Sequence, residues 1–199
     1  MITLPSDEIL FSYASGTLDP ALRLLVERHL ALHPQTQQRL ASFTDFGGLM
    51  LAAEAPAAMT AGSLDRALAR IAANPPPLEP VRSDWPDPAT LKWRWAGPGR
   101  AIAPFTVAGS AYRSYALRIA PGKAMLQHSH SGQEWTLVLQ GSFRDEAGEH
   151  AAGAFLEEDE ATTHTPVATG DRDCLCLSVL AGTLTAPGIM GRIARHIMR

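Results

Sequence analysis

Two histidines and a glutamate stand close together between two glycines in the second half of the chain. The stretch runs from Gly122 to Gly141 and contains His128, His130 and Glu134. On a β-strand, residues i and i+2 point to the same face, so the two imidazoles are expected to converge, and the carboxylate joins them after a short irregular piece. Imidazole and carboxylate suit a divalent ion such as zinc, iron, manganese or nickel. The stretch therefore predicts a metal site, the alternative being polar side chains that fill a metal-free barrel.

The spacing of these residues, G-x5-H-x-H-x3-E-x6-G, resembles the first motif of the cupin superfamily at every fixed position. The resemblance implies a double-stranded β-helix, that is, a jelly-roll barrel of two antiparallel sheets. From about Ala89 onward, short alternating segments are separated by turn residues, which also indicates an all-β sandwich or barrel. Strands are expected near residues 91–95, 101–107, 112–120, 135–143, 153–158, 163–168 and 174–181.

A fourth candidate ligand, His164, begins a later strand, at the place where the second cupin motif has its histidine. The second motif is loose in this chain, because the gap before this histidine is long and the later asparagine is missing. His150, in contrast, lies in a polar turn and is expected to be a solvated loop residue. The acidic run from Glu157 to Glu160 is expected to be a solvated turn near the barrel mouth, although one of its carboxylates could support a metal ligand.

Three histidines and one glutamate leave the identity of the metal open. They complete a tetrahedral zinc site, whereas around iron or manganese they would leave the vacant positions that an oxygenase needs. We predict zinc, with iron, manganese or nickel as alternatives. Cys174 and Cys176 project to the same side of a strand and are interpreted as small core residues, with a redox role near the metal as the alternative. Three further side chains are expected to be packing or surface residues, the alternative being that they reach the barrel interior: Tyr112, Arg113 and Tyr115.

Residues 1–73 predict helices, because their apolar residues recur at helical spacing. The expected helices begin at Ser6, Asp19, Pro34 and Ser63. They are expected to form a small bundle, and since about 70 residues make a thin core, part of the apolar surface is expected to face a partner. The fold class is therefore α + β with two domains, the helices and a cupin domain at residues 89–199, joined by a proline-rich linker at residues 74–88.

Both domains carry further stretches that are typical of one family. The barrel contains Glu134-Trp-Thr-Leu-Val-Leu-Gln-Gly141, His164-Thr-Pro166 and the cysteine pair, and the helical part contains Leu10-Phe-Ser-Tyr13-Ala14. Over nearly its full length the chain resembles ChrR-type anti-sigma factors. The resemblance implies that the helices clamp an extracytoplasmic-function (ECF) sigma factor and block its contacts with RNA polymerase and promoter. It also implies that the cupin domain is needed for release under singlet-oxygen or related oxidative stress.

The N-terminal zinc site implied by this resemblance is incomplete. The family pattern is an early His followed by His-x3-Cys-x2-Cys; here His29 matches, whereas His33 and Thr36 stand at the cysteine positions and the early His aligns near Leu4. Two histidines one helical turn apart do not make a closed structural zinc site, so this part is expected to be held by packing or by its partner. The apolar residues expected to meet the sigma factor are Leu10, Tyr13, Leu22, Leu25, Val26 and Leu30.

The composition argues against several other roles. The formal net charge is −3, so no chain-wide field attracts nucleic acid or an anionic membrane, and no apolar run of about 20 residues spans a bilayer. With two cysteines and no secretory signal after Met1, a reducing cytoplasm is the expected location. Two other functions stay open at this point: a mononuclear metal-dependent cupin oxygenase, and a ligand-binding cupin without chemistry. The sequence is also compatible with an oligomer.

Overall fold

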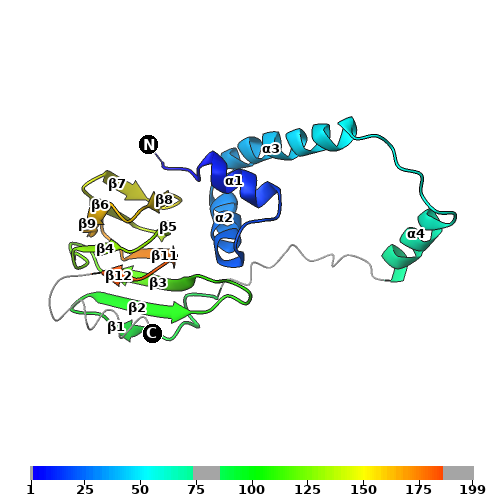
Figure 1. Ribbon diagram of the computed structural model, residues 1–199. Helices are drawn as coiled ribbons and strands as arrows, with labels where there is room; N and C mark the ends of the chain where they lie inside the picture. Colours follow the sequence, from blue (N-terminus) through cyan, green and yellow to red (C-terminus); the bar gives the residue numbers. More distant parts are fainter. Residues whose placement is uncertain (1, 74–85, 186–199) are drawn as a thin grey trace.

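The computed structural model describes residues 2–73 and 86–185, in which four helices precede an all-β barrel (Figure 1). The helices are α1 (Asp7–Ala14), α2 (Pro20–Leu32), α3 (Pro34–Ala53) and α4 (Ser63–Ala73). The strands are β1 (Arg94–Trp95), β2 (Arg100–Phe105), β3 (Arg113–Ile119), β4 (His128–His130), β5 (Glu134–Gln140), β6 (Ser142–Asp145), β7 (Gly148–Ala151), β8 (Phe155–Glu158), β9 (Thr163–His164), β10 (Val167–Thr169), β11 (Cys174–Leu180) and β12 (Leu184–Thr185). The predicted change from helices to strands is confirmed. Most of the linker predicted at residues 74–88 lies outside the described residues.

Local sequence accounts for the starts of the first three helices. The Ser6 side chain caps α1 by accepting a hydrogen bond from an N–H of the first turn. Asp19 caps α2 in the same way, and Pro20 occupies the first helical position, where a missing N–H has no cost. Pro34 opens α3, which continues as far as Ala53. Each of these starts agrees with the sequence prediction.

The strands form one large and two small antiparallel sheets. The large sheet has the order β1-β2-β3-β11-β5-β8, and the small sheets have the orders β10-β6-β7 and β12-β4-β9. The strand β11 lies in the middle of the large sheet and is mostly buried. The small sheet with β4 and β9 holds three of the four predicted metal ligands.

The large sheet has a different core on each of its faces. The inner face, toward the barrel interior, packs around Phe143, Leu156, Cys174 and other buried residues. The outer face is covered by α1 and α2 (Figure 1). The cluster on this outer face contains Leu10, Leu22, Leu25 and Val26 from the helices and Trp135, Leu137, Phe155, Leu177 and Val179 from the strands. The helices therefore share a core with the barrel, in addition to the contacts that α1, α2 and α3 make with one another.

This shared core corrects one expectation from the sequence. Five of the six residues expected to meet a sigma factor are at least nine-tenths buried, and Tyr13 packs against the same cluster. The five are Leu10, Leu22, Leu25, Val26 and Leu30. The prediction was wrong because an apolar helical stripe shows that a partner exists but not which one, and here the partner is the barrel of the same chain.

The helices α3 and α4 extend away from the barrel (Figure 1). The first half of α3 packs on α1, with the rings of Phe11 and Phe43 edge to face at 6.1 Å and Arg39 2.8 Å from Asp7. Its second half is largely exposed, and α4 has no buried residue although one of its faces is apolar. None of the helices that the structure describes combines the length and the apolar character needed to span a bilayer.

Candidate metal centre

Four side chains meet inside the barrel: His128, His130, Glu134 and His164. The first two belong to β4, the glutamate begins β5, and His164 ends β9, which pairs with β4 so that His128 stands opposite His164. All four are buried, and one ligand atom from each lies within 4.8 Å of the others. The structure therefore brings together all four residues predicted as ligands.

The donor atoms of these residues face one another, and those of His130 and Glu134 lack hydrogen-bond partners among the described residues. The Nε2 atoms of His128 and His164 are 3.0 Å apart. Nε2 of His130 touches Oε2 of Glu134, yet among the described residues neither atom has a partner in hydrogen-bond geometry. Buried polar atoms without partners are costly, and a divalent cation among the three nitrogens and the carboxylate oxygen would satisfy them. The residues present fit a metal ion.

Hydrogen bonds behind two of the histidines decide which ring nitrogen faces the centre. Nδ1 of His128 lies 2.7 Å from the carbonyl oxygen of Leu126, which can only accept, so Nδ1 carries the proton and Nε2 keeps its lone pair. Nδ1 of His164 makes the corresponding contact with the carboxylate of Glu158 at 2.8 Å. Metal-binding histidines usually have such a carbonyl or carboxylate behind them. The acidic run was expected to be a solvated turn, but Glu157 and Glu158 belong to the strand β8, and Glu158 matches the alternative that one carboxylate supports a ligand.

Burial and neighbouring charges set the protonation states at the centre. Burial lowers the pKa of His128, which favours the neutral form that binds metals. Burial acts in the same direction on His164, but the hydrogen bond and charge of Glu158 outweigh it and raise the pKa of His164. For Glu134 burial opposes ionisation, yet the close contact with His130 and the charge of its imidazole lower the pKa of this carboxyl. The glutamate is therefore ionised at neutral pH, as a ligand must be.

Tyr115 was expected to be a packing or surface residue, but it belongs to the site. It lies on β3, is almost fully buried, and its hydroxyl donates a hydrogen bond to Oε1 of Glu134. Burial and the charge of Glu134 raise the pKa of Tyr115, so the hydroxyl keeps its proton. Strand alternation was the available signal, because Tyr115 shares a face with Leu117 and Ile119, which line the same interior. Tyr112 and Arg113 agree with the expectation: the first stacks on Trp135 and the second is exposed.

The prediction that His150 is a solvated loop residue was wrong. Its ring is buried on β7 against Phe143, at 4.9 Å between ring centroids, and its Nε2 lies 3.0 Å from Oδ1 of Asp145. The other oxygen of Asp145 lies 3.3 Å from Nδ1 of His164. Burial opposes ionisation of Asp145, but the hydrogen bond and charge of His150 lower its pKa. His150 and Asp145 therefore extend the polar support behind His164. This role was missed from the sequence because the strands β6 and β7, which bury His150, were not predicted.

The two cysteines lie in the inner core, as predicted. Their sulfur atoms are 3.6 Å apart and are not joined by a disulfide. The hydrogen bond with Cys174 and complete burial raise the pKa of the Cys176 thiol. Cys176 also lines a small cavity next to His128 and Glu134. This cavity has a volume of about 30 Å³.

The family of the chain follows from comparison with known proteins. Residues 83–183 match the family described as the ChrR Cupin-like domain. The anti-sigma-E factor ChrR of Cereibacter sphaeroides is 34% identical over 208 aligned residues, which cover 98% of this chain and 96% of the relative. The chain belongs to the ChrR family of anti-sigma factors. A crystal structure of Rhodobacter sphaeroides SigE in complex with the anti-sigma ChrR matches with a TM-score of 0.75 at 34% identity, covering 89% of this chain and 98% of that chain. The resemblance inferred from the sequence to the ChrR family is confirmed.

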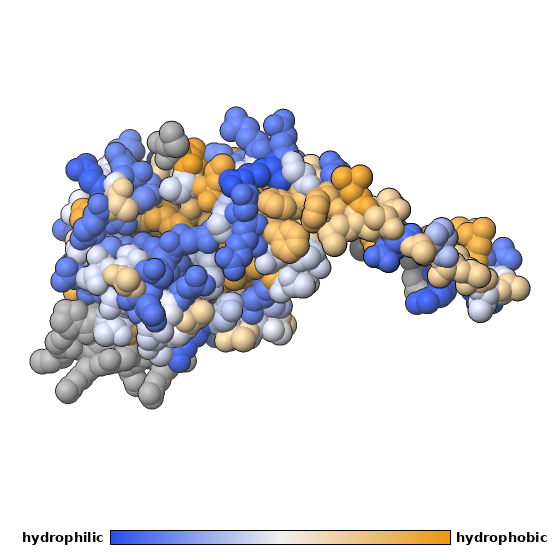
Figure 2. Space-filling view, turned by 45° about the horizontal axis from the view of Figure 1, so that its top comes forward, coloured by the Kyte–Doolittle hydropathy of each residue, from blue (hydrophilic) through white to orange (hydrophobic). Residues whose placement is uncertain are grey.

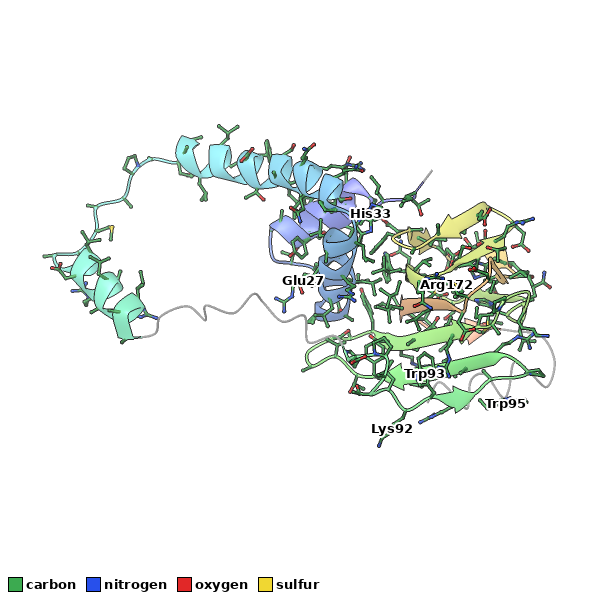
Figure 3. The ribbon with its side chains drawn as sticks, turned by 180° about the vertical axis from the view of Figure 1, so that it is seen from behind. Glu27, His33, Lys92, Trp93, Trp95 and Arg172 are labelled. Atoms are coloured by element: carbon green, nitrogen blue, oxygen red, sulfur yellow. The ribbon has the colours of Figure 1, made fainter. Side chains whose placement is uncertain are left out.

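At the position of the N-terminal zinc site implied by the resemblance to the ChrR family, this chain has a hydrogen-bonded histidine. His29 is fully buried, with Nδ1 3.0 Å from the carbonyl oxygen of Gly153 and Nε2 3.0 Å from Oγ1 of Thr36. Its ring stacks on His33, which Figure 3 labels beside the barrel, and packs edge-on against Phe155. Burial lowers the pKa of His29 to about 4. Both ring nitrogens are engaged, which agrees with the expectation that packing holds this part together.

Proposed function

We propose that this protein is an anti-sigma factor that sequesters an ECF sigma factor through exposed apolar residues on α3 and α4. These residues are the observation that carries the proposal, because each is more than half exposed. They are Phe46, Leu49, Met50 and Leu51 on α3 and Leu64, Leu68 and Ile71 on α4. Figure 2 shows apolar atoms gathered along the arm that projects from the barrel. Large apolar side chains gathered on an exposed surface mark an interaction site, and the related ChrR–SigE complex supplies the class of partner.

The α4 helix has the pattern of a helix that binds in a groove. Leu64, Leu68 and Ile71 are spaced i, i+4 and i+7, so they form one apolar stripe. Among the described residues no member of the stripe is buried, and each is more than half exposed. A sigma factor lying against this stripe and the second half of α3 would cover the apolar surface that the barrel leaves free.

The test is co-purification of the full chain with the ECF sigma factor that it regulates, followed by a binding measurement. Leu68→Glu should weaken binding by at least about tenfold, because it places a charge in the apolar stripe. Ala69→Glu is the matched control, since this position is turned by about 100° from Leu68 on the same exposed helix. If the sigma factor does not co-purify, or if both variants bind equally well, the proposal fails.

We further propose that His128, His130, Glu134 and His164 hold one zinc ion. Three nitrogens and one oxygen complete a tetrahedral zinc site, and the hydrogen bonds behind the ligands support such a site. A bound zinc would cross-link β4, β5 and β9 and neutralise the buried carboxylate. Elemental analysis should find about one zinc per chain, and none in His130→Ala, while His33→Ala keeps its zinc. Iron in place of zinc would contradict this assignment.

The size of the cavity argues against the alternative of a mononuclear oxygenase. Sites for small organic substrates have volumes of about 300–1,000 Å³, whereas the cavity beside the centre measures about 30 Å³. It is lined largely by apolar side chains such as Leu117, Ile119 and Met125, so it is much smaller than a substrate site. A signalling role for the centre needs no such space.

We assign to the barrel a response to oxidative stress of the singlet-oxygen type, and to the protein a place in the cytoplasm, where RNA polymerase acts. The support is membership of the ChrR family. Exposing the purified complex to a photosensitiser and light should release the sigma factor. A complex that carries His164→Ala should respond less, and release at the wild-type rate would contradict the assignment.

A further inference from the structure

The strand β8 carries contacts to the metal centre on one face and contacts to the N-terminal helices on the other. Successive side chains of a strand point to opposite faces of the sheet. Leu156 belongs to the inner core and Glu158 reaches His164, so both face the barrel interior. Phe155 belongs to the outer core and Glu157 reaches Ser6, so both face the helices.

The inner contact ties β8 to two of the proposed ligands. Oε1 of Glu158 accepts the hydrogen bond from Nδ1 of His164 at 2.8 Å. In the pairing of β5 with β8, Glu158 also stands directly opposite Glu134. The position of this end of β8 therefore depends on residues that meet at the metal centre. An ion that holds His164 through Nε2 would fix the imidazole from which Glu158 accepts its hydrogen bond.

The outer contacts tie the same strand to the start of the chain. The carboxylate of Glu157 accepts hydrogen bonds from the Ser6 backbone N–H at 2.6 Å and from the Ser6 hydroxyl at 3.0 Å. The N–H of Phe155 donates to the carbonyl of Thr3 at 2.9 Å. Ser6 is the residue that caps α1, and a carboxylate is favourable at the N-terminal end of a helix. The first turn of α1 is thus anchored to β8.

The place of β8 in the sheet makes it responsive to both sets of contacts. It is the last strand in the order of the large sheet, and among the described residues its one neighbouring strand is β5. The contact with Thr3 lies at the first residue of the strand and the contact with His164 at its last. An edge strand of four residues is held by few bonds, so releasing one end changes the other.

We propose that β8 transmits the state of the metal centre to α1, with the contact between Glu157 and Ser6 as the link. Without the ion, His164 no longer holds Glu158 in place through their hydrogen bond. The strand β8 then becomes more mobile, and the hydrogen bonds between Glu157 and Ser6 at the start of α1 are lost. This inference deepens the proposed function and rests on it, because the released helix matters for regulation when the helical part holds a sigma factor. It differs from a route through the apolar core, in which Trp135, next to Glu134 on β5, would carry the change.

Amide hydrogen exchange of the full chain, with zinc bound and after chelation, tests this link without any sigma factor. In the wild type, exchange in residues 7–14 should become about tenfold faster when zinc is removed, which corresponds to the loss of about one net hydrogen bond. Glu157→Gln should show the fast exchange in both states, with an unchanged zinc content. Glu160→Gln, another exposed carboxylate of the same acidic run, should behave as the wild type.

Three outcomes would overturn the inference: a chain that takes up no zinc, exchange in the wild type that does not respond to zinc, and a response that persists in Glu157→Gln. The last result would indicate the route through Trp135. Because no sigma factor is present, these outcomes are independent of the co-purification that tests the proposed function. The melting temperature of Glu157→Gln with zinc, expected near that of the wild type, shows that the variant is folded.

Discussion

His29 offers the sharpest test of how the helices are fixed to the barrel. It is buried where α2 meets the turn before β8, and burial lowers its pKa to about 4 from an ordinary value of 6.5. In the unfolded chain His29 therefore becomes protonated below about pH 6.5. In the folded chain it becomes protonated only below about pH 4. Between these two pH values the unfolded state binds more protons than the folded state. The contribution of His29 to the free energy of unfolding is therefore complete above pH 6.5 and is lost as the pH falls toward 4.

The size of this effect follows from the two pKa values. Each pKa unit corresponds to 1.36 kcal/mol, so the full difference amounts to about 3 kcal/mol, of which about 2 kcal/mol is lost by about pH 5. A domain of ordinary stability has about 5–15 kcal/mol in total. The loss is therefore large enough to measure by urea unfolding, provided that EDTA is present so that metal release does not contribute.

The comparison that isolates His29 uses two variants at about pH 7.5 and about pH 5. His29→Gln should be less stable than the wild type at the higher pH, because the buried hydrogen bonds are impaired, but should lose about 2 kcal/mol less on acidification. His33→Gln removes the neighbouring imidazole and leaves the hydrogen bonds of His29, so it should lose as much as the wild type. If His29→Gln and the wild type lose the same stability, the imidazole is not held neutral at this interface and the reasoning is refuted.

Three further predictions concern the shared core, the metal centre and the turn before β8. Leu25→Ala should lower the free energy of unfolding by about 2–5 kcal/mol, because the side chain is fully buried between α2 and the sheet; a loss below about 1 kcal/mol in urea unfolding would mean that the helices are not docked. Tyr115→Phe should weaken zinc binding by about tenfold in competition with a chelating dye, because Glu134 loses its supporting hydrogen bond, and unchanged affinity would count against this role. Gly153→Ala should lower the melting temperature, because φ is +91° and a Cβ would collide with the ring of His33, and combining it with His33→Ala should recover part of the loss; no recovery would show that backbone strain alone is responsible.

The four residues that meet at the candidate metal centre could be predicted because their spacing has a direct geometric meaning. Alternation on a strand places His128 and His130 on one face, and a barrel brings a later histidine opposite them. The closing glycine of the motif was equally informative: Gly141 has φ +70° and its backbone lies against Asp173, so a side chain does not fit there. Such features act over a few residues, and the sequence contains all that is needed to recognise them.

The residues that contact the four candidate ligands from behind could not be found in the same way. Tyr115 and Glu158 reach the centre from strands far away in the chain, and their roles depend on the pairing of β3, β11, β5 and β8. His150 looked polar and exposed because its surroundings, Gly148 and Glu149, are turn-like, although the hairpin of β6 and β7 buries its ring. The same limit explains the helices: a stripe predicts burial, but the choice between a partner protein and the barrel is made by tertiary packing.

The core that α1 and α2 share with the barrel also has a consequence for folding during synthesis on the ribosome. The helices end at Leu32, whereas the central strand that completes their binding face begins at Cys174, about 140 residues later. At a translation rate of about 5–20 residues per second, the apolar stripe of α2 stays exposed for roughly 7–30 s before the strand β11 is synthesised. During every round of synthesis, the nascent helices therefore need protection from aggregation and proteolysis, which a chaperone bound near the ribosome exit would provide.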